Sequence, residues 1–148
     1  MSLKSRIQDD VKNAMRAQQR ERLAVLRLVT AAIKQKEVDE RIELDDAQVL
    51  AVLDKMVKQR RESLEQYRSA GRDDLADQEA FELELIQTYL PEPLAEDELA
   101  ELIRKNIEDT GASSIRDMGA VMNALRPKVQ GRADMKAVSQ AVKNQLMG

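Results

Sequence analysis

Apolar residues recur every three or four positions along almost the whole chain, and this spacing predicts amphipathic α-helices. The composition agrees, because aromatic residues make up only 2% and the strong helix formers Ala, Leu, Glu, Lys, Arg and Gln dominate. Five glycines and three prolines are too few to provide the turns of a β protein of 148 residues. The predicted fold class is therefore all-α.

Helix-start and helix-end signals divide the pattern into four longer helices followed by three short ones. Asp45 and Gln48 have the spacing of a capping box, Gly71 and Gly111 stand where helices should end, and Pro91 is expected to end the fourth helix. The longer helices are expected at about 3–18, 21–38, 46–69 and 73–90, with Met15 and Phe81 on their buried faces. The first two short helices should begin near Glu96 and near Ser113 or Ser114. The last one should begin after Asp134, which serves as its N-cap. The break in the helical pattern at Pro91-Glu92-Pro93 predicts an N-terminal helical domain, residues 1–92, and a three-helix C-terminal domain, residues 93–148.

Charge is distributed unevenly along the chain. The formal net charge is −3, but residues 1–36 carry +6, residues 37–110 carry −13 and residues 111–148 carry +4. Binding responds to local potential, so the two basic ends remain compatible with a polyanionic partner despite the acidic total.

Several kinds of chemistry are excluded by residues that the chain lacks. Without histidine or cysteine it has no Ser-His-Asp or Cys-His arrangement and no usual zinc site. Its glycines are too widely spaced for a phosphate-binding loop, and the carboxylates near Glu79, Glu82 and Glu84 are interpreted as a solvated helix face. We therefore expect no catalytic residue, no bound metal and no cofactor.

Two groups of cations in the N-terminal half have a structural interpretation and a functional one. Arg27 lies beside an apolar stripe, where an ion pair tying two helices together is favoured over contact with a ligand phosphate. The run Lys58-Gln59-Arg60-Arg61 is surrounded by acids, so a solvated face is favoured over a nucleic-acid patch.

The C-terminal segment is more strongly basic, since Asp134 is the only acid from Arg126 to the end. A glycine-containing turn that opens a helix presents backbone N–H groups near cations, which suits phosphate. An ordinary basic surface and a polyanion-binding surface are both open interpretations. The candidate nucleic-acid-binding residues are Arg126, Lys128, Gly131, Arg132, Lys136 and Lys143.

Short motifs spread over the whole chain are similar to those of the GatB/YqeY family. They are Leu3-x-x-Arg6-Ile7, Ala14-Met15, Leu23-x-x-Leu26-Arg27, Tyr89-Leu90-Pro91, Met118-Gly119-x-Val121-Met122 and Gly131-Arg132-Ala133-Asp134. The chain resembles a stand-alone YqeY-type protein. Structural roles are expected for Arg27, Pro91, Gly119 and Asp134.

This family shares its helical and tail regions with the B subunit of the tRNA-dependent amidotransferase, whose chemistry lies in a separate catalytic domain. The resemblance therefore implies tRNA contact near Gly131 and Arg132 and no amidation by this chain alone. A protein-interaction adaptor, or a subunit-like participant in carbon–nitrogen ligation with glutamine as amide donor, are the alternatives. The lack of cysteine, of a signal peptide and of a membrane-length apolar run predicts a cytoplasmic location and no membrane contact.

Overall fold

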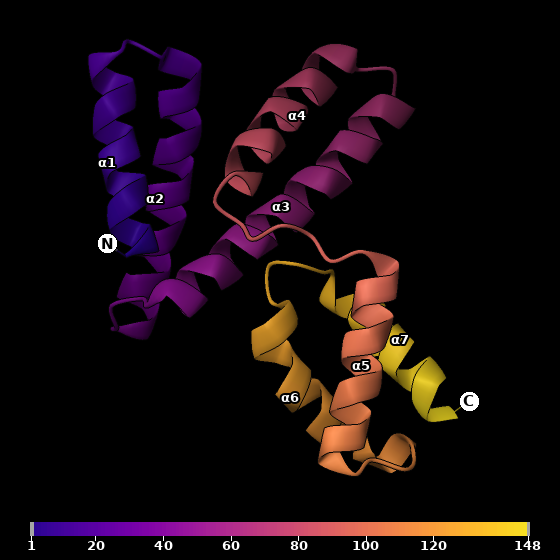
Figure 1. Cartoon of the computed structure of the whole chain (residues 1–148). Helices are drawn as coiled ribbons and strands as arrows, with labels where there is room; N and C mark the ends of the chain where they lie inside the picture. The colour runs from indigo at the N-terminus through magenta and orange to yellow at the C-terminus, as the bar shows by residue number, and fades with distance from the viewer. Residues whose placement is uncertain (1, 148) are drawn as a thin grey trace. The chain divides into compact units, whose positions relative to one another are not determined.

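The computed structural model describes residues 2–147, and all regular structure in that range is helical, which confirms the all-α prediction (Figure 1). The chain divides into two compact units, Met1–Leu90 and Pro91–Gly148. The units are treated separately below, and independent folding of each half stays a prediction. No helix in the described range is long and apolar enough to cross a membrane.

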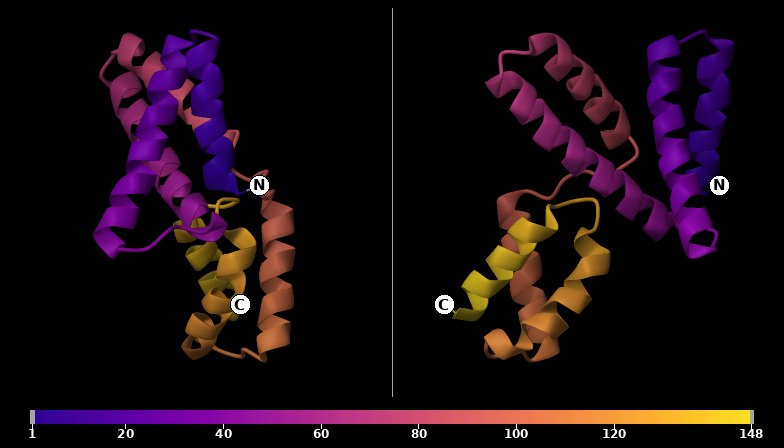
Figure 2. Two further views of the ribbon diagram at one scale, coloured as in Figure 1. Left: turned by 90° about the vertical axis from the view of Figure 1, so that its left-hand side faces the viewer. Right: turned by 180° about the vertical axis from the view of Figure 1, so that it is seen from behind.

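The first unit consists of two helical hairpins. Helices α1 (Leu3–Arg16) and α2 (Arg20–Glu40) lie side by side, as do α3 (Asp46–Ser69) and α4 (Asp73–Gln87) (Figures 1 and 2). Each helix contributes an apolar stripe to one core, as its spacing predicts. The core side chains include Ile7, Ala14, Val25, Leu26, Val29, Ile33, Val49, Leu53, Val57 and Ile86.

Local signals fix most helix ends. Asp45 and Gln48 form the predicted capping box, with both hydrogen bonds 2.9 Å long, and Gly71 has the left-handed φ of +72° that a helix-ending glycine adopts. Two non-glycine residues, Gln18 (φ +56°) and Arg41 (φ +55°), take the same conformation on either side of α2. These two left-handed turns could not be predicted from the sequence, because residues other than glycine rarely adopt the left-handed conformation.

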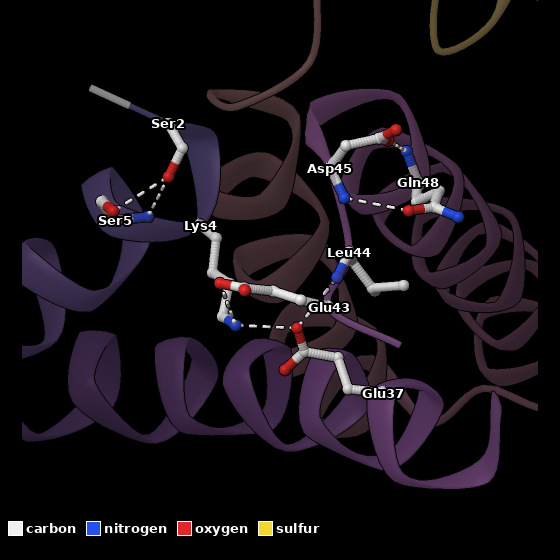
Figure 3. A network of polar contacts seen from close by, with 8 residues as sticks. All are labelled: Ser2, Lys4, Ser5, Glu37, Glu43, Leu44, Asp45 and Gln48. Atoms are coloured by element: carbon white, nitrogen blue, oxygen red, sulfur yellow. Dashed lines mark hydrogen bonds and ion pairs between the residues drawn. The ribbon is translucent and has the colours of Figure 1, made fainter. Parts of the chain in front are cut away.

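A polar network ties three helix ends together (Figure 3). The Lys4 ammonium of α1 lies 2.7 Å from Glu37 Oε2 of α2 and 3.8 Å from the Glu43 carboxylate. The same Glu37 oxygen accepts a hydrogen bond of 2.9 Å from the Leu44 backbone N–H, just before α3. The hydrogen bond from Lys4, followed by that from Leu44, lowers the pKa of Glu37 below its ordinary value.

The predicted extent of α4 is wrong by three residues. The helix ends at Gln87 rather than Leu90, with the Thr88 hydroxyl donating to the Leu85 carbonyl at 2.7 Å, so Pro91 lies beyond the helix end instead of causing it. Tyr89 turns inward, where it is 5% exposed, and donates its hydroxyl hydrogen bond to Asp10 of α1. The Arg6 guanidinium lies 5.1 Å from the centre of the same ring. This tertiary contact draws the chain out of the helix.

The second unit is a three-helix arrangement of α5 (Glu96–Thr110), α6 (Met118–Val129) and α7 (Met135–Met147). A 3-10 turn, Ile115–Asp117, precedes α6, so the sixth helix begins later than predicted. The Asp117 carboxylate caps this turn by accepting the backbone N–H groups of Ser113 and Ser114, which lowers the pKa of Asp117. The core side chains are Ile103, Val121, Leu125, Val129, Val138 and Val142.

Three side-chain predictions need correction. Met15 is 51% exposed, because it lies at the edge of the apolar stripe of α1. Phe81 is 37% exposed, because it is five residues from both buried Ala76 and buried Ile86 and so lies about 140° around α4 from each. Gly119, expected to have a structural role, is exposed in α6, and a Cβ added there would meet nothing within 4 Å. The fold of this chain therefore does not require glycine at position 119.

Candidate nucleic-acid interface

The turn between α6 and α7 is organised around Gly131. Its φ of +75° is left-handed, which glycine adopts without steric cost. The Val129 carbonyl accepts hydrogen bonds from the N–H groups of Arg132 and Ala133, at 2.8 and 3.1 Å. Asp134 then starts α7, since its carbonyl accepts from Val138 N–H and its Oδ1 from Lys136 N–H. Gly131 is buried, so its backbone forms the turn rather than an exposed phosphate-binding surface.

Arg132 is held by the segment that leads into α5. Its Nε donates a 2.9 Å hydrogen bond to the Glu92 carbonyl, and its own carbonyl accepts one of 2.9 Å from the Leu94 N–H. The side chain is only partly exposed. The structure therefore gives this candidate nucleic-acid residue a role inside the second unit.

Lys128 is likewise engaged inside the unit. Its ammonium donates to Asn106 Oδ1 at 3.0 Å, and Asn106 on α5 is 1% exposed. Asn106 also donates from Nδ2 to the Leu102 carbonyl at 2.7 Å. A buried amide needs such partners, so Lys128 satisfies an acceptor that water does not reach. Sequence reasoning missed Asn106, although a lone amide three residues after Ile103 on an apolar stripe is a recognisable signal.

Four candidate cations are exposed: Arg126, Lys128, Lys136 and Lys143. Lys128 bonds to Asn106, whereas within residues 2–147 the side chains of the other three make no ion pair or hydrogen bond. Successive residues of a helix are about 100° apart, so Arg126 points about 160° away from Lys128. Lys136 and Lys143 are two turns apart on one side of α7, about 10 Å along its axis. The six predicted residues are therefore not one surface, and these three are the ones free to meet an anion.

The ion pair predicted for Arg27 is wrong. Its side chain is exposed on α2, and no ion pair involves it among residues 2–147. An arginine on the outer edge of a helix can reach water directly, so it needs no acidic partner.

Lys58, Gln59 and Arg61 of the basic run are exposed, as predicted, and so is Glu84, but one residue of each run is mostly buried. Arg60 Nε lies 3.4 Å from Glu82 Oε2, and both side chains are mostly buried, at 16% and 13% exposure. Burial, and then the charge of Glu82, raises the pKa of Glu79 despite the opposing effect of Arg60. This pair joins the two helices of one hairpin, and its long-range partner could not be chosen from the sequence. No group of three acidic side chains in the described range is placed to hold a metal ion.

The fold and the exposed cations define a class: small all-helical proteins with exposed cations on their last two helices. Within that class, a model of the YqeY-like protein family matches residues 4–146, so the chain belongs to this family. The YqeY part of the predicted resemblance is thereby confirmed.

Several fungal proteins are similar to this chain. The chain is 30% identical over 140 residues to "Altered inheritance of mitochondria protein 41, mitochondrial" of Pyrenophora tritici-repentis, covering 93% of this chain and 77% of that protein. The protein of the same name from Eremothecium gossypii is 39% identical over 57% of this chain. An uncharacterised protein of Schizosaccharomyces pombe is 29% identical over 62% of it. The chain spans 46% of the Eremothecium protein and 74% of the Schizosaccharomyces one.

The predicted cytoplasmic location is wrong on this comparison, because the relatives are named as mitochondrial proteins. The prediction rested on lacking cysteine, a signal peptide and a membrane span, and none of these features distinguishes one aqueous compartment from another.

Proposed function

We propose that this chain is a non-catalytic accessory protein that associates with tRNA and is related to the B subunit of the tRNA-dependent amidotransferase. The observation that carries the proposal is the set of exposed, unpaired cations Arg126, Lys136 and Lys143 on α6 and α7. Membership of the YqeY-like family supports it, and so does the resemblance of the short motifs to those of the GatB/YqeY family.

The chemistry of this surface suits phosphate contact better than base recognition. All three aromatic residues of the chain, Tyr67, Phe81 and Tyr89, precede residue 91, so the second unit has no ring on which a base can stack. Lysine and arginine side chains instead neutralise phosphates and release counterions. Binding of this kind reads the shape and charge of a folded RNA.

The test measures the affinity of the full-length protein for labelled tRNA by fluorescence anisotropy over a range of salt concentrations. The triple variant Arg126→Glu, Lys136→Glu, Lys143→Glu should bind more weakly. The slope of log affinity against log salt should also become shallower by about 2 to 3, since each lost phosphate contact removes about 0.7 to 0.9.

A matched control reverses three exposed cations of α3, through Lys55→Glu, Lys58→Glu and Arg61→Glu. This control changes the net charge by the same amount but leaves the α6–α7 surface intact. Equal loss of affinity in both triple variants would show that only overall charge matters and would refute the proposed surface.

A further inference from the structure

Helix α2 carries apolar side chains on the face that points away from its core. Leu28 is 46% exposed, Val38 is 60% exposed, and Ile42 just beyond the helix end is 41% exposed. The buried face of the same helix is formed by Val25, Leu26, Val29 and Ile33. The exposed positions follow one another at alternating intervals of four and three residues, the spacing of a coiled-coil seam: Ala24, Leu28, Ala31, Gln35, Val38 and Ile42.

A row of cations runs beside this apolar seam. Arg27, Lys34 and Arg41 are spaced seven residues apart, and all three are exposed. Arg27 and Lys34 directly precede seam residues within α2, so they follow a single edge of the seam, and Arg41 lies in the left-handed turn that ends the helix. In the described part of the chain none of the three makes an ion pair. The opposite edge differs in sign, because it carries Asp39, which accepts a hydrogen bond from Gln35 at 2.8 Å.

The surface is hollowed along the cation row. One hollow of about 440 Å³ lies between α1 and α2, and its lining includes Lys4, Arg27, Ala31 and Lys34. A second hollow of about 380 Å³ adjoins it, shares Lys4, Lys34 and Glu37, and continues past Val38, Arg41 and Ile42. From Arg27 to the helix end at Glu40 the groove follows about 20 Å of α2, the length of a short helix, and it continues to Ile42 beyond the left-handed turn at Arg41.

The charge of this groove is positive overall. Its two carboxylates, Glu37 and Glu43, both pair with Lys4 at one end of the groove (Figure 3). Lys34 also lowers the pKa of Glu37 through its charge, so Glu37 interacts with both Lys4 and Lys34, whereas Arg27 and Arg41 make no ion pair in the described part of the chain. The groove thus offers an apolar seam with a cationic edge.

We propose that this α2 groove is the docking site for an amphipathic helix of a partner protein, one with an apolar stripe and an acidic flank. Apolar residues at three- and four-residue spacing accept the stripe of a facing helix, and flanking charges select the partner and its direction. The proposal goes beyond the tRNA surface of α6 and α7 and rests on different residues.

Three other occupants fit the same features less well. In a second copy packed antiparallel on the same seam, the cationic edges would face one another and repel. A membrane-surface helix carries cations throughout its polar face and a wide apolar face, whereas here one edge holds Asp39 and the seam includes Gln35. A nucleic acid would use the cations but leave Leu28, Val38 and Ile42 exposed to water.

The experiment titrates the full-length protein with a stapled synthetic helix of about 20 residues that has leucines at alternating intervals of three and four and glutamates along one edge. A second peptide carries lysines in place of the glutamates. Isothermal titration calorimetry gives the two affinities, and backbone NMR shifts locate the contact. We expect the glutamate peptide to bind with shifts along α2 and the lysine peptide to bind at least tenfold more weakly.

Variants separate the two features of the groove. Val38→Asp should weaken the glutamate peptide about tenfold, because it places a charge in the seam, and Arg27→Glu with Lys34→Glu should exchange the preference between the peptides. The control is Lys55→Glu with Lys58→Glu on α3, which makes the same charge change and should leave both affinities unaltered. Circular dichroism of each variant verifies that it remains helical.

The outcomes decide between the occupants. Glutamate-peptide binding that reverses with the charge swap supports the proposal. Any one of four results would overturn it: absence of peptide binding, equal affinity for both peptides, concentration-dependent dimerisation abolished by Val38→Asp, or binding to anionic phospholipid vesicles or tRNA through Arg27 and Lys34 in place of peptide binding.

Discussion

Lys128 provides the sharpest test of how this structure divides its cations between packing and function. Lys128→Met keeps most of the side-chain length and a similar helix propensity but removes the donor to the buried Asn106 Oδ1. An unsatisfied buried acceptor costs about 1 to 3 kcal/mol. A unit of the size of residues 91–148 has a free energy of unfolding on the order of 3 to 9 kcal/mol, so the loss should be large.

Amide hydrogen exchange measured by NMR is the suitable assay. Tyrosine fluorescence does not report on this unit, because both tyrosines, Tyr67 and Tyr89, lie outside it. The protected amides of α6, such as those of Val121 and Leu125, should exchange roughly 5- to 160-fold faster in Lys128→Met, the ratio that corresponds to the expected free-energy loss.

Two companion variants make the result specific. Arg126→Met changes an exposed cation of the same helix and should alter stability by no more than about 0.5 kcal/mol. Asn106→Leu combined with Lys128→Met replaces both polar partners with apolar groups and should recover most of the lost protection. If Lys128→Met and Arg126→Met had equal effects, or if the two changes at positions 106 and 128 were additive, the packing role of Lys128 would be refuted.

Three further outcomes are expected. Arg132→Ala, which removes the bond to the Glu92 carbonyl, should lower the stability of the second unit by about 0.5 to 1.5 kcal/mol and speed exchange of the nearby backbone amides. Glu37 has a pKa below its unfolded value, so it contributes stability at neutral pH that is lost as pH falls through that lowered pKa; Glu37→Gln should therefore show a smaller difference between urea midpoints at pH 7 and pH 3. Gly119→Ala should raise the free energy of unfolding by about 0.5 to 1 kcal/mol, whereas Gly111→Ala, at φ +70°, should lower it by about 1 to 2 kcal/mol, both measured by thermal unfolding.

The parts of the fold that could be predicted are those set by neighbouring residues. Asp45 and Gln48 are three residues apart, and their reciprocal caps need nothing from the rest of the chain. Gly71 and Gly111 similarly end helices through their own backbone conformations. The helical periodicity belongs to the same class, because each stripe is contained within one segment.

The candidate site was harder to predict because its residues are partnered across long separations. Arg132 bonds to a carbonyl 40 positions earlier in the sequence, and Lys128 bonds to an amide 22 positions earlier. The residues that neighbour each cation in the sequence do not indicate which distant residue will be its partner. The basic segment, its glycine turn and the family resemblance therefore suggested six residues, and three of them, Lys128, Gly131 and Arg132, also have roles inside the second unit. Arg27 shows the converse, since the sequence suggested a partner that its exposed position does not require.

The contact between Tyr89 and Asp10 bears on the order in which the chain is made. The hydroxyl joins residues 79 positions apart, from the first helix to the penultimate residue of the first unit. During synthesis α1 must therefore wait, without its Tyr89 partner, until nearly the whole unit has left the ribosome. Helices α1 and α2 can pair earlier, but a nascent chain arrested before residue 89 has no means of making this contact. The first unit can therefore be completed only after Tyr89, which lies next to the beginning of the second unit, has left the ribosome.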